Sequence, residues 1–380
     1  MRRIAVIFSG LAALTAVLFL LVWFMPGLQE KIVRGGMVRA LTKAQNPDFM
    51  QDDGLHILIC GTGSPMPDLT RASACAAVIA GGHVVIIDTG PGSWAKLAAT
   101  NVPAAKIDTV LLTHLHSDHI GDLGELATQS WLGGRTVPLN VYGPPAPPDT
   151  ERTTDEEGEI FGASGTEAVV KGFAQSYNAD AEFRIAQGHE LVPTEAARMI
   201  GHDIPRPGPQ EAVTVYDRDG LKISAFRVNH NPVEPAYGYR IDYKGRAAVI
   251  SGDTTKVQNM VRFSRGADVL VHEALSNALV EMLAAALDKS GNERAGTMAR
   301  QIKAYHTTPV EAADIAREAE VPLLVYTHMV PPLRNALMRH MFMAGVDAAR
   351  GDSGKTMLAT DGLLITLPPD SHDITTKPLL

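Results

Sequence analysis

The stretch THLHSDH at residues 113–119 constrains this chain more than any other feature. It directly follows an apolar, strand-like run, and it carries four side chains that can bind metals: His114, His116, Asp118 and His119. In an extended segment His114 and His116 point to the same side, so their imidazoles can share one cation. Asp118 and His119 are then available to a second cation. Because imidazole and carboxylate are ligands of zinc and similar divalent ions, we interpret the stretch as a metal site.

Three further residues of ligand type stand where predicted strands end. Asp253 follows the apolar run 247–251, His328 follows the run 323–326, and His230 follows a third run. Strand ends in layered α/β folds are where sites are usually built. A carboxylate such as Asp253 can bridge two cations, because it has two oxygens, whereas a single imidazole rarely does.

The motif HxHxDH with later His, Asp and His resembles the metallo-β-lactamase superfamily of hydrolases. Other motifs are similar to the branch of transfer-RNA 3′-processing endonucleases (ribonuclease Z) and arylsulfatase-like enzymes. They are CGTGSP at 60–65, SGDT at 251–254, HEA at 272–274 and HTTP at 306–309. The resemblance covers residues 54–366 in the same order.

The resemblance implies two divalent cations, with zinc the first expectation and Mn²⁺ and Fe²⁺ as alternatives. It implies that one cation is bound by His114, His116 and His230. It implies that Asp118, His119 and His328 bind the other, with Asp253 between them. True β-lactamases of this superfamily generally have a cysteine at that bridging position, so antibiotic hydrolysis is disfavoured.

Three residues are the expected catalytic groups: Asp118, His306 and Glu273. Two cations about 3.5 to 4 Å apart lower the pKa of a shared water, so a metal-bound hydroxide is the expected nucleophile, which Asp118 can orient. His306 is the candidate proton donor to the leaving group. It precedes residues 308–311, which predict a capped helix start with a reciprocal capping box. The resemblance implies that Glu273 keeps His306 protonated.

The rest of the chain predicts one large α/β domain over residues 54–367. Apolar strand-like runs alternate with helical patterns, and the resemblance implies a four-layer αββα sandwich. Residues 143–219 differ in composition, because proline, glycine and acidic residues are frequent there. We interpret them as an insertion over the mouth of the active site. Residues 368–380 are expected to be a C-terminal tail.

The first 25 residues predict a membrane anchor. Residues 4–25 are 22 consecutive uncharged positions, long enough to cross a bilayer as a helix. No small-residue cleavage site ends the run, so an uncleaved signal anchor is favoured, followed by a linker over residues 26–53. We therefore expect a membrane-anchored catalytic domain that is periplasmic or otherwise outside the cytoplasm.

Charge and location together decide the expected substrate. The segment 149–159 is acidic and the formal net charge is −8, whereas nucleic-acid binding needs clustered lysine and arginine. We therefore expect a small anionic phosphodiester or sulfate ester, cleaved in an arylsulfatase-like reaction, and no nucleic acid. The alternatives are a 3′ transfer-RNA processing endoribonuclease and a non-catalytic, membrane-tethered metal-binding or sensing domain. A homodimer stays open.

The two cysteines, Cys60 and Cys75, flank a loop between two predicted strands. They form either a disulfide or two small buried apolar side chains.

Overall fold

A computed structural model describes residues 21–45, 47–147, 165–188 and 193–380. The chain divides into two compact units, residues 1–51 and 52–380. In the first unit, helix α2 spans Pro26–Gln45 and a 3-10 helix spans Asp48–Met50. Most of the expected linker is therefore helical. The reason is local, because Pro26 suits the first helical position, and Leu, Glu, Lys, Arg and Ala are common after it.

The predicted transmembrane helix lies mainly outside the described residues, which begin at residue 21. Among the helices in the described ranges, none is both long enough and apolar enough to cross a membrane.

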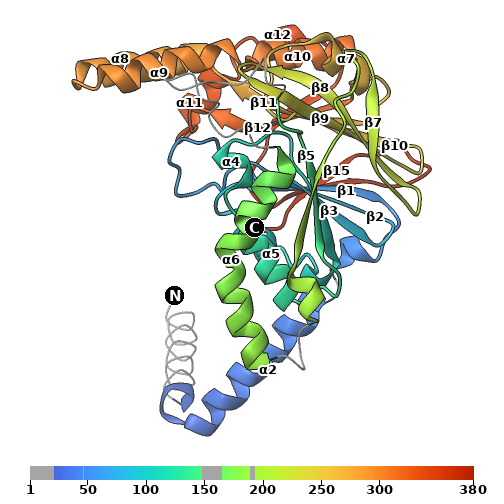
Figure 1. Ribbon diagram of the computed structural model, residues 1–380. Helices are drawn as coiled ribbons and strands as arrows, with labels where there is room; N and C mark the ends of the chain where they lie inside the picture. The colour runs from blue at the N-terminus through green and yellow to red at the C-terminus, as the bar shows by residue number, and fades with distance from the viewer. Residues whose placement is uncertain (1–20, 46, 148–164, 189–192) are drawn as a thin grey trace, which may run out of the picture. The chain divides into compact units, whose positions relative to one another are not determined.

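Two β-sheets build the second unit (Figure 1). The first has the strand order β15-β14-β1-β2-β3-β4-β5-β6, and the second has the order β13-β12-β11-β10-β9-β8-β7. The strands of the first sheet are β1 (Leu55–Gly61), β2 (Cys75–Ala80), β3 (His83–Ile87), β4 (Ile107–Leu111), β5 (Leu139–Gly143), β6 (Met199–Asp203), β14 (Leu363–Leu367) and β15 (Thr375–Pro378). Those of the second are β7 (Ala212–Arg218), β8 (Leu221–His230), β9 (Val233–Tyr243), β10 (Arg246–Ile250), β11 (Val269–Leu275), β12 (Leu323–Val330) and β13 (Lys355–Leu358).

Helices cover the outer face of each sheet, which confirms the predicted α/β fold with two sheets (Figure 1). On the first sheet, α3 (Ser93–Ala99) packs against β1, and α6 (Thr166–Gly188) packs against β5 and β6, beside α5 (Leu123–Leu132). On the second, α7 (Gln258–Ser264) packs against β8, and α10 (Pro309–Glu318) packs against β11 and β12 and contacts α12 (Val346–Arg350). The remaining helices are α4 (Ser117–Ile120), α8 (Asn277–Lys289), α9 (Glu293–Gln301) and α11 (Ala336–Phe342).

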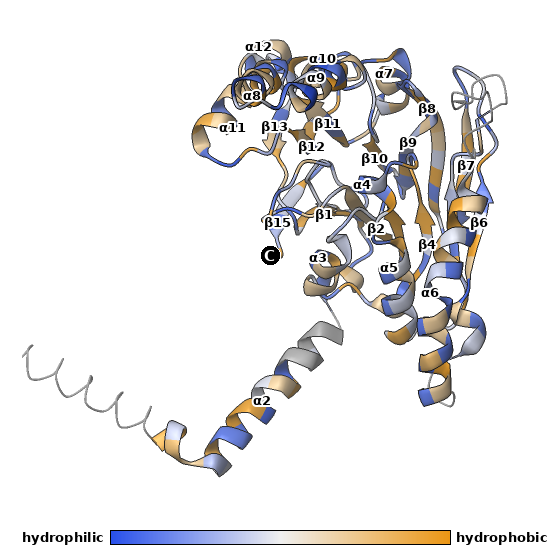
Figure 2. Cartoon of the chain, turned by 60° about the vertical axis from the view of Figure 1, so that its left-hand side comes forward, coloured by the Kyte–Doolittle hydropathy of each residue, from blue (hydrophilic) through white to orange (hydrophobic). Residues whose placement is uncertain are grey.

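The main core lies between the two sheets. Alternate residues of β1, namely Leu55, Ile57 and Ile59, belong to one buried cluster with Tyr239 and Ile241 of β9. All seven residues of β1 are buried, because helices cover the other face of the sheet. Such strands carry apolar residues on both faces, and hydrophobic residues are accordingly frequent along the strands in Figure 2.

The predicted insertion and tail both contribute strands to the sheets. Within residues 143–219, β6 forms an edge of the first sheet and β7 forms an edge of the second, while the acidic segment 149–159 lies outside the described residues. In the expected tail, β15 pairs with β14 in antiparallel register. These edge strands are partly or fully exposed, so they lack the apolar runs that make buried strands visible in a sequence.

Cys60 and Cys75 form a disulfide that closes the loop between β1 and β2. We expect reduction to lower the free energy of unfolding by about 3 kcal/mol. The disulfide restricts the unfolded chain by closing a loop of this length, and reduction restores the conformational entropy of that chain. Denaturant titrations with and without reductant measure the difference. Two free thiols in the denatured, unreduced protein would contradict the bond.

Candidate active site

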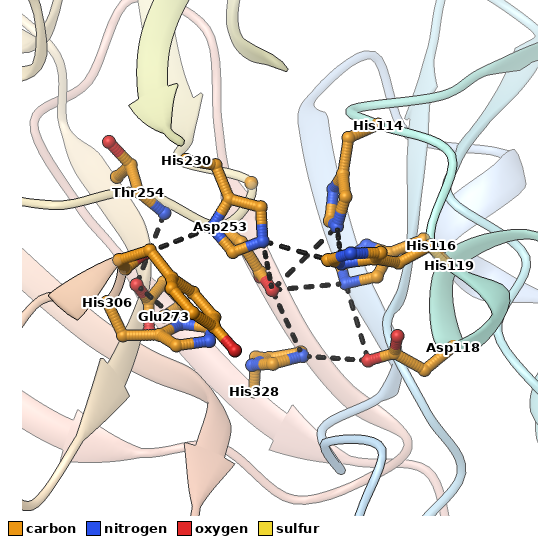
Figure 3. Close-up of polar contacts among 12 residues, drawn as sticks. His114, His116, Asp118, His119, His230, Asp253, Thr254, Glu273, His306 and His328 are labelled. Carbon is orange, nitrogen blue, oxygen red and sulfur yellow. Dashed lines mark hydrogen bonds and ion pairs between the residues drawn. The ribbon is translucent and has the colours of Figure 1, made fainter. Parts of the chain in front are cut away.

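The structure brings all seven predicted metal-binding side chains together at one edge of the sandwich (Figure 3). The stretch 113–119 follows β4, and Asp253 follows β10. His230 ends β8, and His328 lies in β12. Strands β3, β4 and β5 are parallel, as are β10, β11 and β12, so their carboxyl ends reach the same edge.

Three imidazoles form the first group. His114 Nε2 lies 2.9 Å from His116 Nδ1, which lies 3.4 Å from His230 Nε2. The Nδ1 of His230 donates to the carbonyl of Tyr305 at 3.0 Å, which leaves Nε2 directed at the other two rings. Burial lowers the pKa of His230 to about 4 and the pKa of His114 well below its usual value. Neutral imidazoles whose nitrogen lone pairs converge in this way could hold one cation.

The second group contains Asp118, His119 and His328, all buried. Asp118 Oδ2 lies 3.1 Å from His328 Nε2 and 3.6 Å from His119 Nε2. The Nδ1 of His119 donates to Asp88 at 2.8 Å, so that Nε2 faces the site. Asp88 also accepts from the backbone N–H and the hydroxyl of Thr113, each at 2.8 Å. These bonds fix the ring of His119.

Asp253 lies between the two groups. Its Oδ2 is 3.5 Å from the Nε2 atoms of His119 and His328, and 4.0 Å from those of His114 and His230. Burial alone would raise the pKa of Asp253, but His328 and His119 outweigh burial and hold that pKa well below its usual value. The carboxylate is thus charged and central, as a bridging group must be.

The donor set fits two divalent cations. Asp118 and Asp253 bury negative charge, which requires positive charge nearby. His119 Nε2 is buried and makes no hydrogen bond to the residues that the structure describes, although Asp118 and Asp253 lie close to it. A metal ion would use that lone pair and neutralise both carboxylates. The donor set does not fix which metal is bound, because zinc, manganese and iron all accept nitrogen and oxygen ligands.

Gly252 allows the backbone to place Asp253. Its φ is +60°, and a Cβ there would lie 2.7 Å from the carbonyl oxygen of Tyr237 and 2.9 Å from Cβ of Thr113. The loop therefore lies directly against the strand end that carries the histidine stretch.

We expect Gly252→Ala to lower the free energy of unfolding by roughly 2–5 kcal/mol, as the sum of about 1–2 for a left-handed residue and about 1–3 for overpacking. Gly245→Ala is the matched control, because Gly245 has a φ of +76° and nothing within 4 Å of its added Cβ. In the control, the free energy of unfolding should fall only by the contribution of the left-handed residue. Equal losses in denaturant titrations would show that the close approach at Gly252 has no energetic effect.

His306 and Glu273 lie beside this cluster. Glu273 Oε1 accepts from the backbone N–H groups of Thr254 and Thr307, at 3.2 and 3.0 Å. The same oxygen lies 3.2 Å from His306 Nδ1, an ion-pair distance at an angle outside that of a good hydrogen bond. Burial opposes the charge on His306, but Glu273 prevails and raises the pKa of that imidazole to about 9. The predicted capping box at residues 308–311 is confirmed.

Sequence reasoning missed several of the partners that orient these side chains. The carbonyl of Tyr305 on His230, the Thr113 hydroxyl on Asp88, and the two backbone amides on Glu273 all join segments far apart in the chain or depend on backbone direction. His328 has a φ of +43° at a register shift between β11 and β12, and no local pattern predicts this conformation.

Comparisons with known proteins agree on one family. The family model described as "Beta-lactamase superfamily domain" matches residues 83–329. A ribonuclease Z from Mycobacterium sp. (strain KMS) is 32% identical over 281 residues, which cover 73% of this chain and 85% of that protein. A ribonuclease Z from Mycobacterium marinum is 33% identical over 329 residues, or 84% of this chain and 98% of that protein.

Solved structures share the fold at lower identity. The short form of human tRNase Z has a TM-score of 0.55 and 22% identity, with 82% of this chain and 99% of that chain covered. The metallo-β-lactamase fold protein YhfI from Bacillus subtilis also has a TM-score of 0.55 and 22% identity, with 83% and 100% covered. These likenesses concern the fold alone.

The relatives correct two predictions. A small anionic ester as the partner, with no nucleic acid, is wrong, because the relatives above 30% identity carry the name of an RNA-cleaving enzyme. The acidic segment behind that prediction lies outside the described residues. A membrane-anchored domain outside the cytoplasm is also corrected, because the relatives above 30% identity are named ribonuclease Z, and the names carry no mention of an anchor. The homodimer stays a prediction.

Proposed function

The chain belongs to the metallo-β-lactamase superfamily of hydrolases and to its ribonuclease Z branch, and we propose that it cleaves RNA phosphodiester bonds at the 3′ end of transfer-RNA precursors. One observation carries this proposal. A chain that aligns with 98% of the length of a ribonuclease Z also gathers all seven candidate ligands beside the His306–Glu273 pair. A purely structural metal site would need neither two ligand groups nor that pair.

The proposed roles follow from the geometry. Two groups of side chains would each hold one cation, with Asp253 between them. The first group is His114, His116 and His230, and the second is Asp118, His119 and His328. Two divalent cations held there would lower the pKa of a water molecule and stabilise charge on the phosphoryl oxygens. Asp118 stands at the edge of the second group, where it can orient the attacking water. His306 turns Nδ1 towards Glu273, so its Nε2 is the nitrogen that donates a proton to the leaving ribose oxygen.

The Glu273–His306 contact predicts a change in the pH profile. A proton donor must be protonated, so activity should fall as the pH rises through the pKa of His306, about 9. In Glu273→Gln the charge that raises this pKa is lost while burial remains. The alkaline limb of kcat should therefore move to lower pH. If the alkaline limb does not move in the variant, Glu273 does not keep His306 protonated.

End-labelled precursor transfer RNA tests the proposed function. Mapping of the products should show one cut at the 3′ side of the acceptor stem, and the cut should disappear with a chelator. An RNA left intact by the purified, metal-loaded chain would overturn the proposal. Random cleavage along the RNA would contradict the assigned substrate.

A further inference from the structure

Tyr305 is held at the edge of the catalytic centre by its main chain. Its carbonyl accepts the Nδ1 proton of His230 at 3.0 Å, and its own N–H closes the 3-10 helix Ile302–Ala304. The next residue is His306. The position of Tyr305 is therefore fixed by bonds that do not involve its side chain, so the ring can be substituted without removing the acceptor of His230.

The ring of Tyr305 extends the aromatic lining of the site into solvent. Its centroid lies 5.1 Å from that of His230 at 87°, and 5.1 Å from that of His306 at 47°. His230 is buried and the His306 side chain is only 7% exposed, whereas Tyr305 is half-buried. In Figure 3 His306 lies below His230, and their ring centroids are 5.2 Å apart. A partly exposed aromatic surface thus adjoins the proposed proton donor.

The hydroxyl of Tyr305 differs from those of two buried tyrosines. The hydroxyl of Tyr239 donates to the carbonyl of Leu112, and that of Tyr326 donates to the carbonyl of Pro309. The Tyr305 hydroxyl makes no hydrogen bond to any residue in the described ranges. The fold therefore uses the main chain of Tyr305 and the edge of its ring, and leaves the rest of the side chain accessible.

On the basis of the proposed RNA cleavage, we propose that the Tyr305 ring stacks on the base of the nucleotide whose ribose oxygen leaves. His306 donates its proton to that oxygen, and the base is joined to the same ribose. The base therefore lies within one sugar of the ring that flanks His306. Stacking on an aromatic face accepts any base, which suits substrates that share a shape and differ in sequence.

The experiment is a double-mutant cycle between Tyr305 and the base. Tyr305→Leu and Tyr305→Phe are compared on a precursor transfer RNA that is intact or carries an abasic ribose on one side of the cut. Tyr305→Leu should lower kcat/KM roughly 10- to 100-fold, which at about 1.4 kcal/mol per factor of ten is within the range of base–aromatic stacking. Tyr305→Phe should stay close to wild type. The control is Phe183→Leu, an aromatic residue that is 67% exposed on α6 and outside the site.

The abasic substrates separate stacking from support of the fold. An abasic ribose on the leaving-group side should slow the wild type as much as Tyr305→Leu does, and it should slow Tyr305→Leu no further. An abasic ribose on the other side of the cut should lower kcat/KM of Tyr305→Leu by the same factor as it lowers kcat/KM of the wild type. Three results would overturn the stacking. The first is additive losses of kcat/KM on the leaving-group side, and the second is a loss of kcat/KM in Tyr305→Phe equal to that in Tyr305→Leu. The third is loss of bound metal in Tyr305→Leu. If the wild type leaves RNA intact, the proposed function itself fails, and the stacking fails with it.

Discussion

Asp118→Ala is expected to reduce RNA cleavage roughly 10³- to 10⁵-fold, because loss of one cation removes several kcal/mol of transition-state stabilisation. The carboxylate lies within 3.1 Å of His328 and 3.6 Å of His119, so its removal would leave a second cation with only two imidazoles and Asp253 to hold it. Elemental analysis of the variant should show metal content falling from two equivalents per chain towards one.

Asp352→Ala is the matched control for Asp118→Ala, because it removes an exposed aspartate outside the site. It should keep full activity and both cations. Circular dichroism should show that both variants are folded. If Asp118→Ala retains two cations and near-normal turnover, Asp118 is neither a ligand nor a group that orients water.

His306→Ala is expected to lose about 10²- to 10⁴-fold in kcat for RNA while retaining both cations, since proton donation to a leaving group contributes that much. Ribose oxygen is a poor leaving group without a proton. The p-nitrophenolate of the probe bis-p-nitrophenyl phosphate leaves without one, so hydrolysis of that probe should fall much less. The contrast between the two substrates distinguishes lost proton donation from a distorted site.

His340→Ala provides the corresponding control on an exposed histidine of α11. It should change neither substrate's turnover. An equal loss of both activities in His306→Ala, or a loss of bound metal, would assign His306 a structural role in place of proton donation.

The sequence predicted the buried part of the fold well. Strands such as β1, β10 and β11 are buried along their whole length, so their apolar runs are continuous and their ends are clear. Most of the candidate ligands follow strand ends, namely those of β4 and β10, which made much of the cluster predictable from the sequence. Edge strands such as β7 carry exposed residues at alternate positions and are not distinct from loops in a sequence.

Contacts between segments that are distant in the chain could not be predicted from the sequence. The carbonyl of Tyr305 and the left-handed backbone of His328 depend on how separate strands and turns meet, and no residue type specifies them. The substrate was mispredicted for a different reason. Net charge and one acidic segment describe composition, whereas RNA binding depends on which side chains surround the site once the chain is folded.

We infer that seven side chains hold two cations and that both cations are needed to cleave RNA. The direct test returns metal in known equivalents to the metal-free chain while cleavage of precursor transfer RNA is measured, using the cation that elemental analysis finds in the purified protein. We expect cleavage to rise to its plateau as the second equivalent binds, because the ligands form two groups joined by Asp253. Full activity at one equivalent, or cleavage by the metal-free chain, would show that RNA cleavage does not need two cations.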